Sequence, residues 1–524
     1  MTADAPRSSP LRRWLAPPFT VLLFLVHPLL AIFRPHGLLQ DPGTGWHLVT
    51  GRYILDTGRV PARDLFSYTA AGHEWIDFAW LFEAASSLLV RWGGLPLFAT
   101  ACVLVYAFIP VLIFRRALHM GAALAPAVVM TLLAYLVLCS HAIARPHIVT
   151  YVFFALLLER LDDFQNGRLP GRALWWLPLL ALAWANLHGG FLVGFALCGV
   201  FAAVAALRSV ALRDAEERRR ALVFVALLVA MGLATLVNPY GLRLHTAIHE
   251  YLSLASNRYF IEFQSPNFLE GAAPVLSFEA LVLALVLVLG LGGRKLAWVE
   301  VALLGFFLHE ALHSARHMNL FAILAAPIIA REVTPWLERL RPALAERWRE
   351  IVREQAALRS PLVYFPAACA LFVTLSLAGR LPFPRTLDDL RLSRGAAEFM
   401  ATHPGRFGRL FNTDDLGGAI VYRFWPALRV FVDDRTAVFG EEFMERRYFR
   451  VLYGRRGWRK VLDRYGVTAA VVDVGALCTA LLRASPGWEV AYEDGMNAIF
   501  FRADTTGAPA APRRTGSPPF AFPR

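Results

Sequence analysis

The chain has 524 residues, of which 57% are hydrophobic and only 18% are charged, and its mean hydropathy is +0.47. This composition excludes an ordinary soluble domain, and several apolar runs reach the roughly 20 residues that cross a bilayer. The net charge of +13 does not indicate nucleic-acid binding, because the basic residues lie in short loops between the apolar runs. We therefore predict a multi-pass membrane protein with no nucleic-acid partner.

Residues 15–379 are predicted to form a bundle of about eleven transmembrane helices. The expected spans are 15–34, 93–114, 121–140, 147–161, 173–187, 190–207, 221–238, 275–293, 297–313, 318–330 and 361–379. A long loop, residues 35–92, follows the first span and contains two helices that are too polar to cross, at 46–57 and 78–92. Residues 332–359 are charged and amphipathic, which is typical of a helix that lies along the membrane surface.

The distribution of arginine predicts the orientation of this bundle. With residues 1–14 in the cytoplasm, every loop on the cytoplasmic side is basic, whereas the alternate loops each carry few arginines. We therefore expect a protein of the bacterial inner (plasma) membrane with a cytoplasmic N-terminus and an extracytoplasmic C-terminal domain.

Residues 380–503 are predicted to form that exported domain, with a small α/β fold. The segments "GRLFNT", "LRVFVDD", "TAAVVDV" and "WEVAYED" are typical of short strands, and helical stretches at 439–463 and 475–484 separate them. Residues 504–524 are rich in Pro, Ala and Arg, which predicts a disordered tail. The expected fold class is an all-α membrane bundle with a small C-terminal α/β domain.

Polar side chains gather on the outward side of the predicted bundle. With this topology, eleven of the fourteen histidines lie there: His36, His47, His73, His141, His147, His188, His245, His249, His309, His313 and His317. Ionisable groups at membrane depth usually face a cavity and mark a functional site. The alternative for each residue alone is that it anchors a span at the interface or belongs to an ordinary polar loop.

The loop at 35–92 supplies the candidate catalytic residue. Asp41 precedes Pro42 directly after the first span, beside aromatic residues and arginines, where a carboxylate can act as general base for an acceptor hydroxyl or amine. Asp64 is a second acidic candidate in the same loop, and Glu262 is another on the same predicted side. The alternative for Asp41 is a turn or helix-capping role before the helix at 46–57.

This loop resembles the first outward loop of GT-C class membrane glycosyltransferases, which take sugars from polyprenyl-phosphate donors. "DPGTGWHLVTGRYILDTG" is similar to the Asp-Pro start in oligosaccharyltransferase catalytic subunits, and "GHEWIDFAWLFEAAS" to the second loop helix of the mannosyltransferase and aminoarabinose-transferase branches. The motifs "ARPH", "NLHGG", "NPYG" and "RHxxLF" indicate an uncharacterised bacterial subgroup. The resemblance implies an inverting glycosyltransferase that moves a sugar to a lipid, glycan or protein acceptor at the outer face.

The donor's phosphate requires fixed positive charge, and span-end arginines suit it because a planar guanidinium matches phosphate oxygens. The candidates for donor-phosphate and substrate binding are Arg145, Arg243, Arg316, His47, His147, His188, Asn186 and Asn238. Each arginine alone is equally well explained as an interfacial anchor.

The chain also departs from the oligosaccharyltransferase pattern. No glutamate follows Asp41, the short loop at 140–147 carries no carboxylate where metal-using members place an acidic pair, and residues 380–503 lack their tryptophan-rich acceptor motif. The sequence therefore specifies no certain cofactor. A divalent metal is possible but is not favoured, and a metal-independent transfer fits better than protein N-glycosylation.

A second motif predicts different chemistry. His309-Glu310-x-x-His313 has the zincin spacing, which places two histidines on one helical face with Glu310 as a base. Zinc would need a third ligand, for which Glu262 and His317 are the candidates. The alternative functions are therefore an intramembrane zinc metalloprotease or a non-enzymatic membrane transporter, although a transporter would need polar residues in the cytoplasmic half of the spans.

Overall fold

The computed structural model describes residues 18–291 and 295–503, so the predicted segments 1–14 and 504–524 lie outside the described residues. The chain divides into two compact units. Among the described residues, the helical unit comprises 18–41, Thr50–Val60, 76–291 and 295–386, and the sheet unit comprises Pro42–Val49, Pro61–Trp75 and 387–503. The sheet unit thus takes in two pieces of the first loop in addition to the predicted C-terminal domain.

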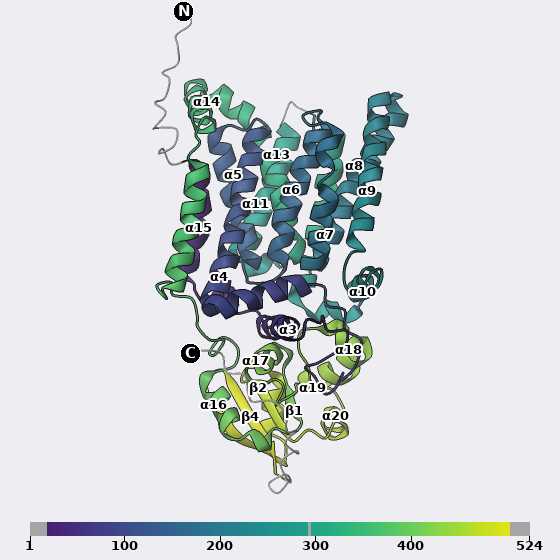
Figure 1. Cartoon of the computed structure of the whole chain (residues 1–524), viewed down its shortest axis with the longest axis vertical. Helices are drawn as coiled ribbons and strands as arrows, with labels where there is room; N and C mark the ends of the chain where they lie inside the picture. The colour runs from purple at the N-terminus through teal and green to yellow at the C-terminus, as the bar shows by residue number, and fades with distance from the viewer. Residues whose placement is uncertain (1–17, 292–294, 504–524) are drawn as a thin grey trace, which may run out of the picture. The chain divides into compact units, whose positions relative to one another are not determined.

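Long helices build the helical unit; α8 packs against α9, and α5 packs against α13 (Figure 1). In chain order they are α2 (Phe19–Phe33), α4 (Trp80–His119), α5 (Leu124–Leu138), α6 (His147–Gln165), α7 (Leu177–Leu187), α8 (Leu192–Leu212), α9 (Ala215–Thr235), α10 (Arg243–Leu252), α11 (Ala273–Leu291), α12 (Trp298–His313), α13 (Met318–Leu340), α14 (Pro342–Ala356) and α15 (Pro361–Leu377). A helix lies at each of the predicted spans.

The apolar helices indicate a membrane protein, but fewer of them than predicted are long enough to cross a membrane. Among the described residues, five helical stretches are long and apolar enough to cross: Trp80–His119, Leu124–His141, Gly189–Leu212, Ala273–Leu291 and Ala315–Leu340. Helices α2 and α15 are apolar but shorter. Helix α7 has only 11 residues, and α6 carries four charged residues near its C-terminal end. The eleven-span topology therefore stays a prediction.

Two helix boundaries follow from glycine and proline. Helix α4 contains both the predicted loop helix at 78–92 and the next span, and non-helical backbone at Gly93 and Gly94 bends it between them; Gly94 has a φ of 69°. The predicted single helix at 332–359 is wrong. Its first residues continue α13 to Leu340, and α14 begins at Pro342, because proline starts a helix more readily than it continues one.

The sheet unit contains a four-stranded sheet in the order β1-β2-β4-β3. Strand β1 (Leu410–Asn412) pairs in parallel with β2 (Ala469–Asp473), whereas β4 (Asn497–Arg502) pairs antiparallel with β2 and with β3 (Trp488–Glu493). The helices of this unit are α16 (Arg394–Thr402), α17 (Asp414–Phe424), α18 (Thr436–Phe443), the π-helical turn η10 (Met444–Tyr448), α19 (Phe449–Leu452), α20 (Trp458–Arg464) and α21 (Leu477–Arg483). Helix α3 (Thr44–Thr57) begins in this unit and continues into the helical unit.

One predicted strand is not part of this sheet. The segment "LRVFVDD", residues 428–434, makes a single bridge between Val430 and Ser67. The side chain of Asn412 occupies the backbone groups that a strand would use, since its Oδ1 accepts from Phe431 N at 2.8 Å and its Nδ2 donates to Val432 O at 2.7 Å. The fourth strand is instead β4, which none of the four predicted strands covers.

Candidate functional site

Asp41 lies directly against an arginine of a distant loop. It follows the short helix η1 (Gly37–Leu39) by two residues, and its side chain is only 2% exposed. The backbone N–H of Ala144 donates to Leu38 O at 2.8 Å, which ties the loop after α5 to the turn before Asp41. As a result, Arg145 Nε lies 3.3 Å from Asp41 Oδ1.

The same guanidinium faces a second carboxylate. Arg145 Nη1 lies 3.8 Å from Glu262 Oε2, on the short helix η6 (Ile261–Phe263). Two hydrogen bonds fix this segment to the residues before Arg316. Ser314 Oγ donates to Glu262 O and Ala315 N donates to Gln264 O, each at 2.8 Å. Glu262 therefore approaches Arg145 from a third part of the chain.

A second arginine completes this group. Arg316, on the short helix η8 (Ala315–His317), places its guanidinium carbon 4.4 Å from the centre of the Phe263 ring. Burial raises the pKa of Glu262, but the charges of Arg145, Arg316 and His141 outweigh it and hold that pKa below its ordinary value. We call Asp41, Arg145, Glu262 and Arg316 the Arg145 cluster. It joins two cations and two carboxylates, all within the helical unit.

The charges of Arg145 and Arg316 both act on His188. Its Nδ1 accepts from Thr150 Oγ1 at 2.7 Å and from Gly190 N at 3.2 Å, and Thr150 Oγ1 also accepts from Trp184 Nε1 at 2.8 Å. Burial, and then the charges of Arg316 and Arg145, lower the pKa of His188 to about 3. His188 is therefore a neutral side chain at physiological pH, fixed in one orientation.

His147 is held by the neighbouring turn. Its Nε2 lies 2.8 Å from His141 O, and its ring centre lies 5.4 Å from that of Tyr151. The Tyr151 hydroxyl accepts from Asn319 Nδ2 at 2.7 Å. These groups lie on α6, α13 and the turn between α5 and α6.

Three other predicted substrate ligands make contacts that stabilise turns or a helix. Asn186 accepts from Trp80 Nε1 at 2.8 Å and donates to Val237 O at 2.9 Å. Asn238 donates to Gly241 O at 3.1 Å, across its own turn. Arg243 forms a two-point ion pair with Glu250 along α10, at 2.7 and 2.9 Å. The structure does not place these three in the Arg145 cluster.

Asp64 belongs to a buried ion cluster of the sheet unit. Its Oδ1 accepts from Arg435 Nη2 at 2.8 Å, and its Oδ2 accepts from Ser67 N and Oγ at 3.0 and 2.6 Å. Asp64 is thus engaged in fixing its own loop to Arg435. His47 is buried in the same unit, with its ring centre 3.7 Å from that of Trp46.

The zincin-like residues lie on one helix face without a complete ligand set. The rings of His309 and His313 on α12 are stacked with their centres 6.2 Å apart. Glu310 Oε2 lies 3.6 Å from His317 Nδ1. Within residues 18–291 and 295–503, no three His, Cys, Asp or Glu side chains converge in a way that would hold a metal ion. In this part of the chain, the zinc-protease alternative therefore has no third ligand.

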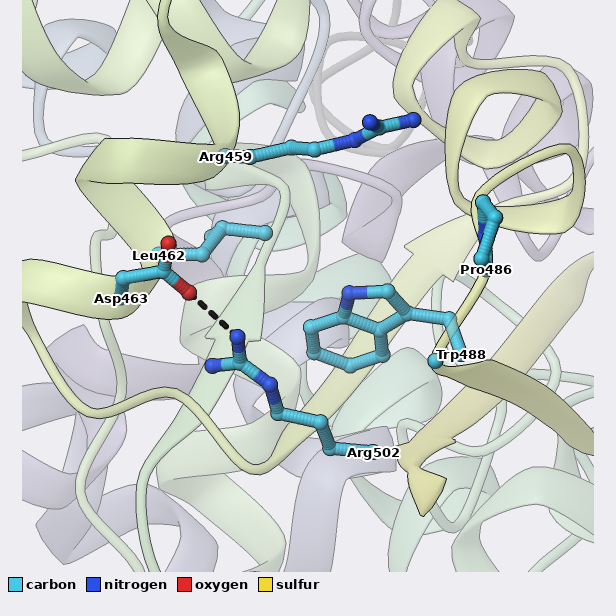
Figure 2. Close-up of a pocket in the computed structure, with 7 residues that line it drawn as sticks. Arg459, Leu462, Asp463, Pro486, Trp488 and Arg502 are labelled. Carbon is cyan, nitrogen blue, oxygen red and sulfur yellow. Dashed lines mark hydrogen bonds and ion pairs between the residues drawn. The ribbon is translucent and has the colours of Figure 1, made fainter. Parts of the chain in front are cut away.

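A small polar cleft lies elsewhere, in the sheet unit. It encloses about 130 Å³, and Figure 2 shows the indole of Trp488 between Arg459 and Arg502, with Arg502 paired to Asp463. None of the residues predicted from the sequence to form the site lines this cleft.

Several polar groups buried inside the helices around His188 and His147 were not among the residues predicted from the sequence. Thr150 and Tyr151 follow His147 by three and four residues on α6, which places them on the same helical face. That spacing was a signal available from the sequence. Asn319, by contrast, follows Met318 at the start of an apolar helix and carries no such pattern.

No protein-family model and no curated protein sequence matches the chain. Its structure is similar to that of AglB, an archaeal oligosaccharyltransferase from Archaeoglobus fulgidus solved with an inhibitory peptide and a dolichol-phosphate. The two are 11% identical, with a TM-score of 0.51 over 87% of this chain and 69% of that chain. The apo form of the Archaeoglobus fulgidus oligosaccharyltransferase is 12% identical, with a TM-score of 0.49 over 87% of this chain and 69% of that one. The chain thus has a fold similar to that of an archaeal oligosaccharyltransferase, which agrees with the resemblance of its first loop to such enzymes.

Proposed function

We propose that this protein is an integral membrane glycosyltransferase that moves a sugar from a polyprenyl-phosphate donor to a lipid, glycan or protein acceptor. The observation that carries the proposal is the Arg145 cluster, in which buried Asp41 lies 3.3 Å from Arg145. The fold adds support, since AglB has been solved with a dolichol-phosphate, which is a lipid phosphate of the proposed donor class.

In the proposed reaction Asp41 is the general base. It takes the proton of the acceptor hydroxyl or amine, and the acceptor's oxygen or nitrogen forms a bond to the anomeric carbon of the sugar. The bond from that carbon to the phosphate oxygen breaks, and the lipid phosphate leaves with the electron pair. A single displacement of this kind inverts the anomeric centre.

The two arginines of the cluster are the proposed ligands of the leaving phosphate. A guanidinium is charged at every physiological pH and offers planar, paired N–H donors to phosphate oxygens. Arg145 and Arg316 come from different elements, so they can approach one phosphate from two directions. His188, held neutral beside them, is the proposed polar contact to the donor.

We further propose that the reaction takes place at the outer face of a bacterial inner membrane, with the N-terminus in the cytoplasm. The basic loops of the predicted topology support this orientation. Residues 380–503 would then be an extracytoplasmic domain attached to the last membrane helix.

Replacing Asp41 with asparagine tests the proposal. We expect sugar transfer from a polyprenyl-phosphate donor pool in membranes to fall by about 100-fold or more, because asparagine cannot accept the proton. Asp56→Asn is the matched control, since Asp56 lies on the same loop at helix α3 but is 39% exposed and pairs with Arg91. Transfer at the wild-type rate in Asp41→Asn membranes, or identical glycans in the wild-type and deletion strains, would exclude the proposed reaction.

A further inference from the structure

The strongest feature that the proposed function leaves unexplained is the position of Arg145 between two carboxylates. Asp41 lies 3.3 Å from its Nε and Glu262 lies 3.8 Å from its Nη1. The two carboxylates are far apart in the sequence, and separate backbone contacts hold them: Ala144 N to Leu38 O near Asp41, and Ala315 N to Gln264 O near Glu262. The guanidinium is therefore the group on which both acidic side chains converge.

This arrangement does not suit a divalent metal ion. Magnesium, manganese and calcium bind oxygen ligands at roughly 2.0–2.6 Å and need several of them. Here the two carboxylates are joined by Arg145, and the next charged neighbour of Glu262 is Arg316, which is another cation. No set of three metal-ligating side chains forms among the described residues. A metal ion between Asp41 and Glu262 would have to displace the Arg145 side chain.

We propose that Arg145 takes the place of a divalent metal ion: its guanidinium holds Asp41 and Glu262 together, and the site needs no metal. The catalytic part of this inference rests on the proposed function, because it assigns the fixed positive charge near the leaving phosphate to the chain itself. The structural part does not, because it concerns only which cation the two carboxylates hold.

The structural part makes a prediction that is independent of activity. Removing Arg145 leaves Asp41 and Glu262 without the guanidinium between them, so a divalent metal ion whose remaining ligands are water should bind in its place. In the purified full-length protein after EDTA treatment, Mn²⁺ titrations followed by electron paramagnetic resonance should show no Asp41-dependent binding in the wild type. Arg145→Ala should bind one Mn²⁺ per chain at least about tenfold more tightly than the wild type.

Two further variants identify the site. Arg145→Ala/Asp41→Asn should lose the new Mn²⁺ binding, because one of the two carboxylates is gone. Arg91→Ala is the matched control, since it removes an arginine from the surface pair with Asp56 and leaves only one carboxylate behind. It should gain no Mn²⁺ site. Gain of Mn²⁺ binding by Arg91→Ala equal to that of Arg145→Ala would contradict the inference.

The wild type alone can overturn the inference, even if Arg145→Ala does not fold. Mn²⁺ binding by the wild-type protein that disappears in Asp41→Asn would show that the carboxylates hold a metal and not Arg145. A folded Arg145→Ala protein that binds no Mn²⁺ would equally refute it, since the two carboxylates would then not converge.

Transfer assays test the catalytic part separately. Wild-type transfer should change by less than about twofold when EDTA is added, whereas Arg145→Ala should lose transfer and regain part of it with Mn²⁺. If neither the wild type nor any variant transfers sugar under any condition, the proposed function fails, while the Mn²⁺ titrations still decide whether Arg145 occupies the position of a metal. Loss of wild-type transfer in EDTA, with recovery on adding Mn²⁺, would overturn the inference and leave the proposed function standing.

Discussion

Replacing Arg435 with methionine tests how the sheet unit holds the loop segment 61–75. The Arg435 side chain is 4% exposed, and its partners Asp64 and Asp433 are 0% exposed. Its Nη2 donates to Asp64 Oδ1 at 2.8 Å and to Asp433 Oδ2 at 2.6 Å, and its guanidinium carbon lies 4.3 Å from the centre of the Trp75 ring. Methionine keeps part of the apolar contact but removes the charge that both carboxylates share.

The expected loss of stability depends on the two carboxylates, which stay buried after Arg435 is removed. Loss of one partner from a buried ion pair destabilises a protein by about 3–5 kcal/mol, and loss of the contact with Trp75 adds about 1 kcal/mol. Burial, partly offset by Arg435, already raises the pKa of Asp433, so uptake of a proton by one carboxylate limits the loss. We expect a net loss of about 4 kcal/mol, which lowers the melting temperature of a domain of this size by about 8–16 °C.

Thermal unfolding of the full-length protein in detergent, followed by intrinsic tryptophan fluorescence, measures this change. Arg429→Met is the matched control, because Arg429 is exposed in the same segment of the unit and should leave the midpoint within about 2 °C. Arg435→Met/Asp433→Asn should recover part of the loss, since one buried negative charge is then removed as well. A melting temperature of Arg435→Met equal to that of Arg429→Met would refute the reasoning.

Two further predictions concern the stability of the same unit. Gly418→Ala should destabilise it by about 2 kcal/mol or more, because the new Cβ would lie 2.0 Å from Pro42 O, whereas Gly475→Ala, with open space around it, should have little effect on the same melting curve. Asp414 should make the stability depend on pH: burial first, and then Asp415, raise its pKa from 3.8 to about 6, so its contribution is fully present below pH 3.8 and is lost as the pH rises through 6. Asp414→Asn should therefore raise the melting temperature at pH 8 and not at pH 3.5, and equal shifts at both pH values would contradict this assignment.

Hydrophobic runs predicted where the helices lie, because burial of apolar side chains decides helix position at every predicted span. They did not settle how many helices cross a membrane, since α7 is too short and α6 is charged at one end. In the sheet unit, the side chain of Asn412 takes the hydrogen bonds of the predicted strand at 428–434. A side chain that comes from another segment cannot be assigned to those groups from local patterns. The missed strand β4 had a local signal, since Asp494, Gly495 and Met496 make a short connection between it and β3.

In the candidate site too, the sequence predicted individual residues but not the contacts between segments that are far apart in the chain. The sequence predicted that Asp41, Arg145, Glu262 and Arg316 lie on the same outward side of the bundle, where ionisable residues usually mark a functional site. Their pairing depends on contacts between segments far apart in the chain, such as Ala144 N to Leu38 O, which no spacing reveals. Asp64 had the same local character as Asp41, yet its partner Arg435 is 371 residues away.

Fold and chemistry therefore need separate arguments in this protein. Likeness to an oligosaccharyltransferase at 11% identity shows the arrangement of the helices, while catalysis depends on the few side chains that the fold brings together. In this chain the proposed side chains are two carboxylates joined by a guanidinium, and arginine keeps its charge at every physiological pH. The lowered pKa of Glu262 keeps that side chain ionised at neutral pH, where the guanidinium of Arg145 balances its charge.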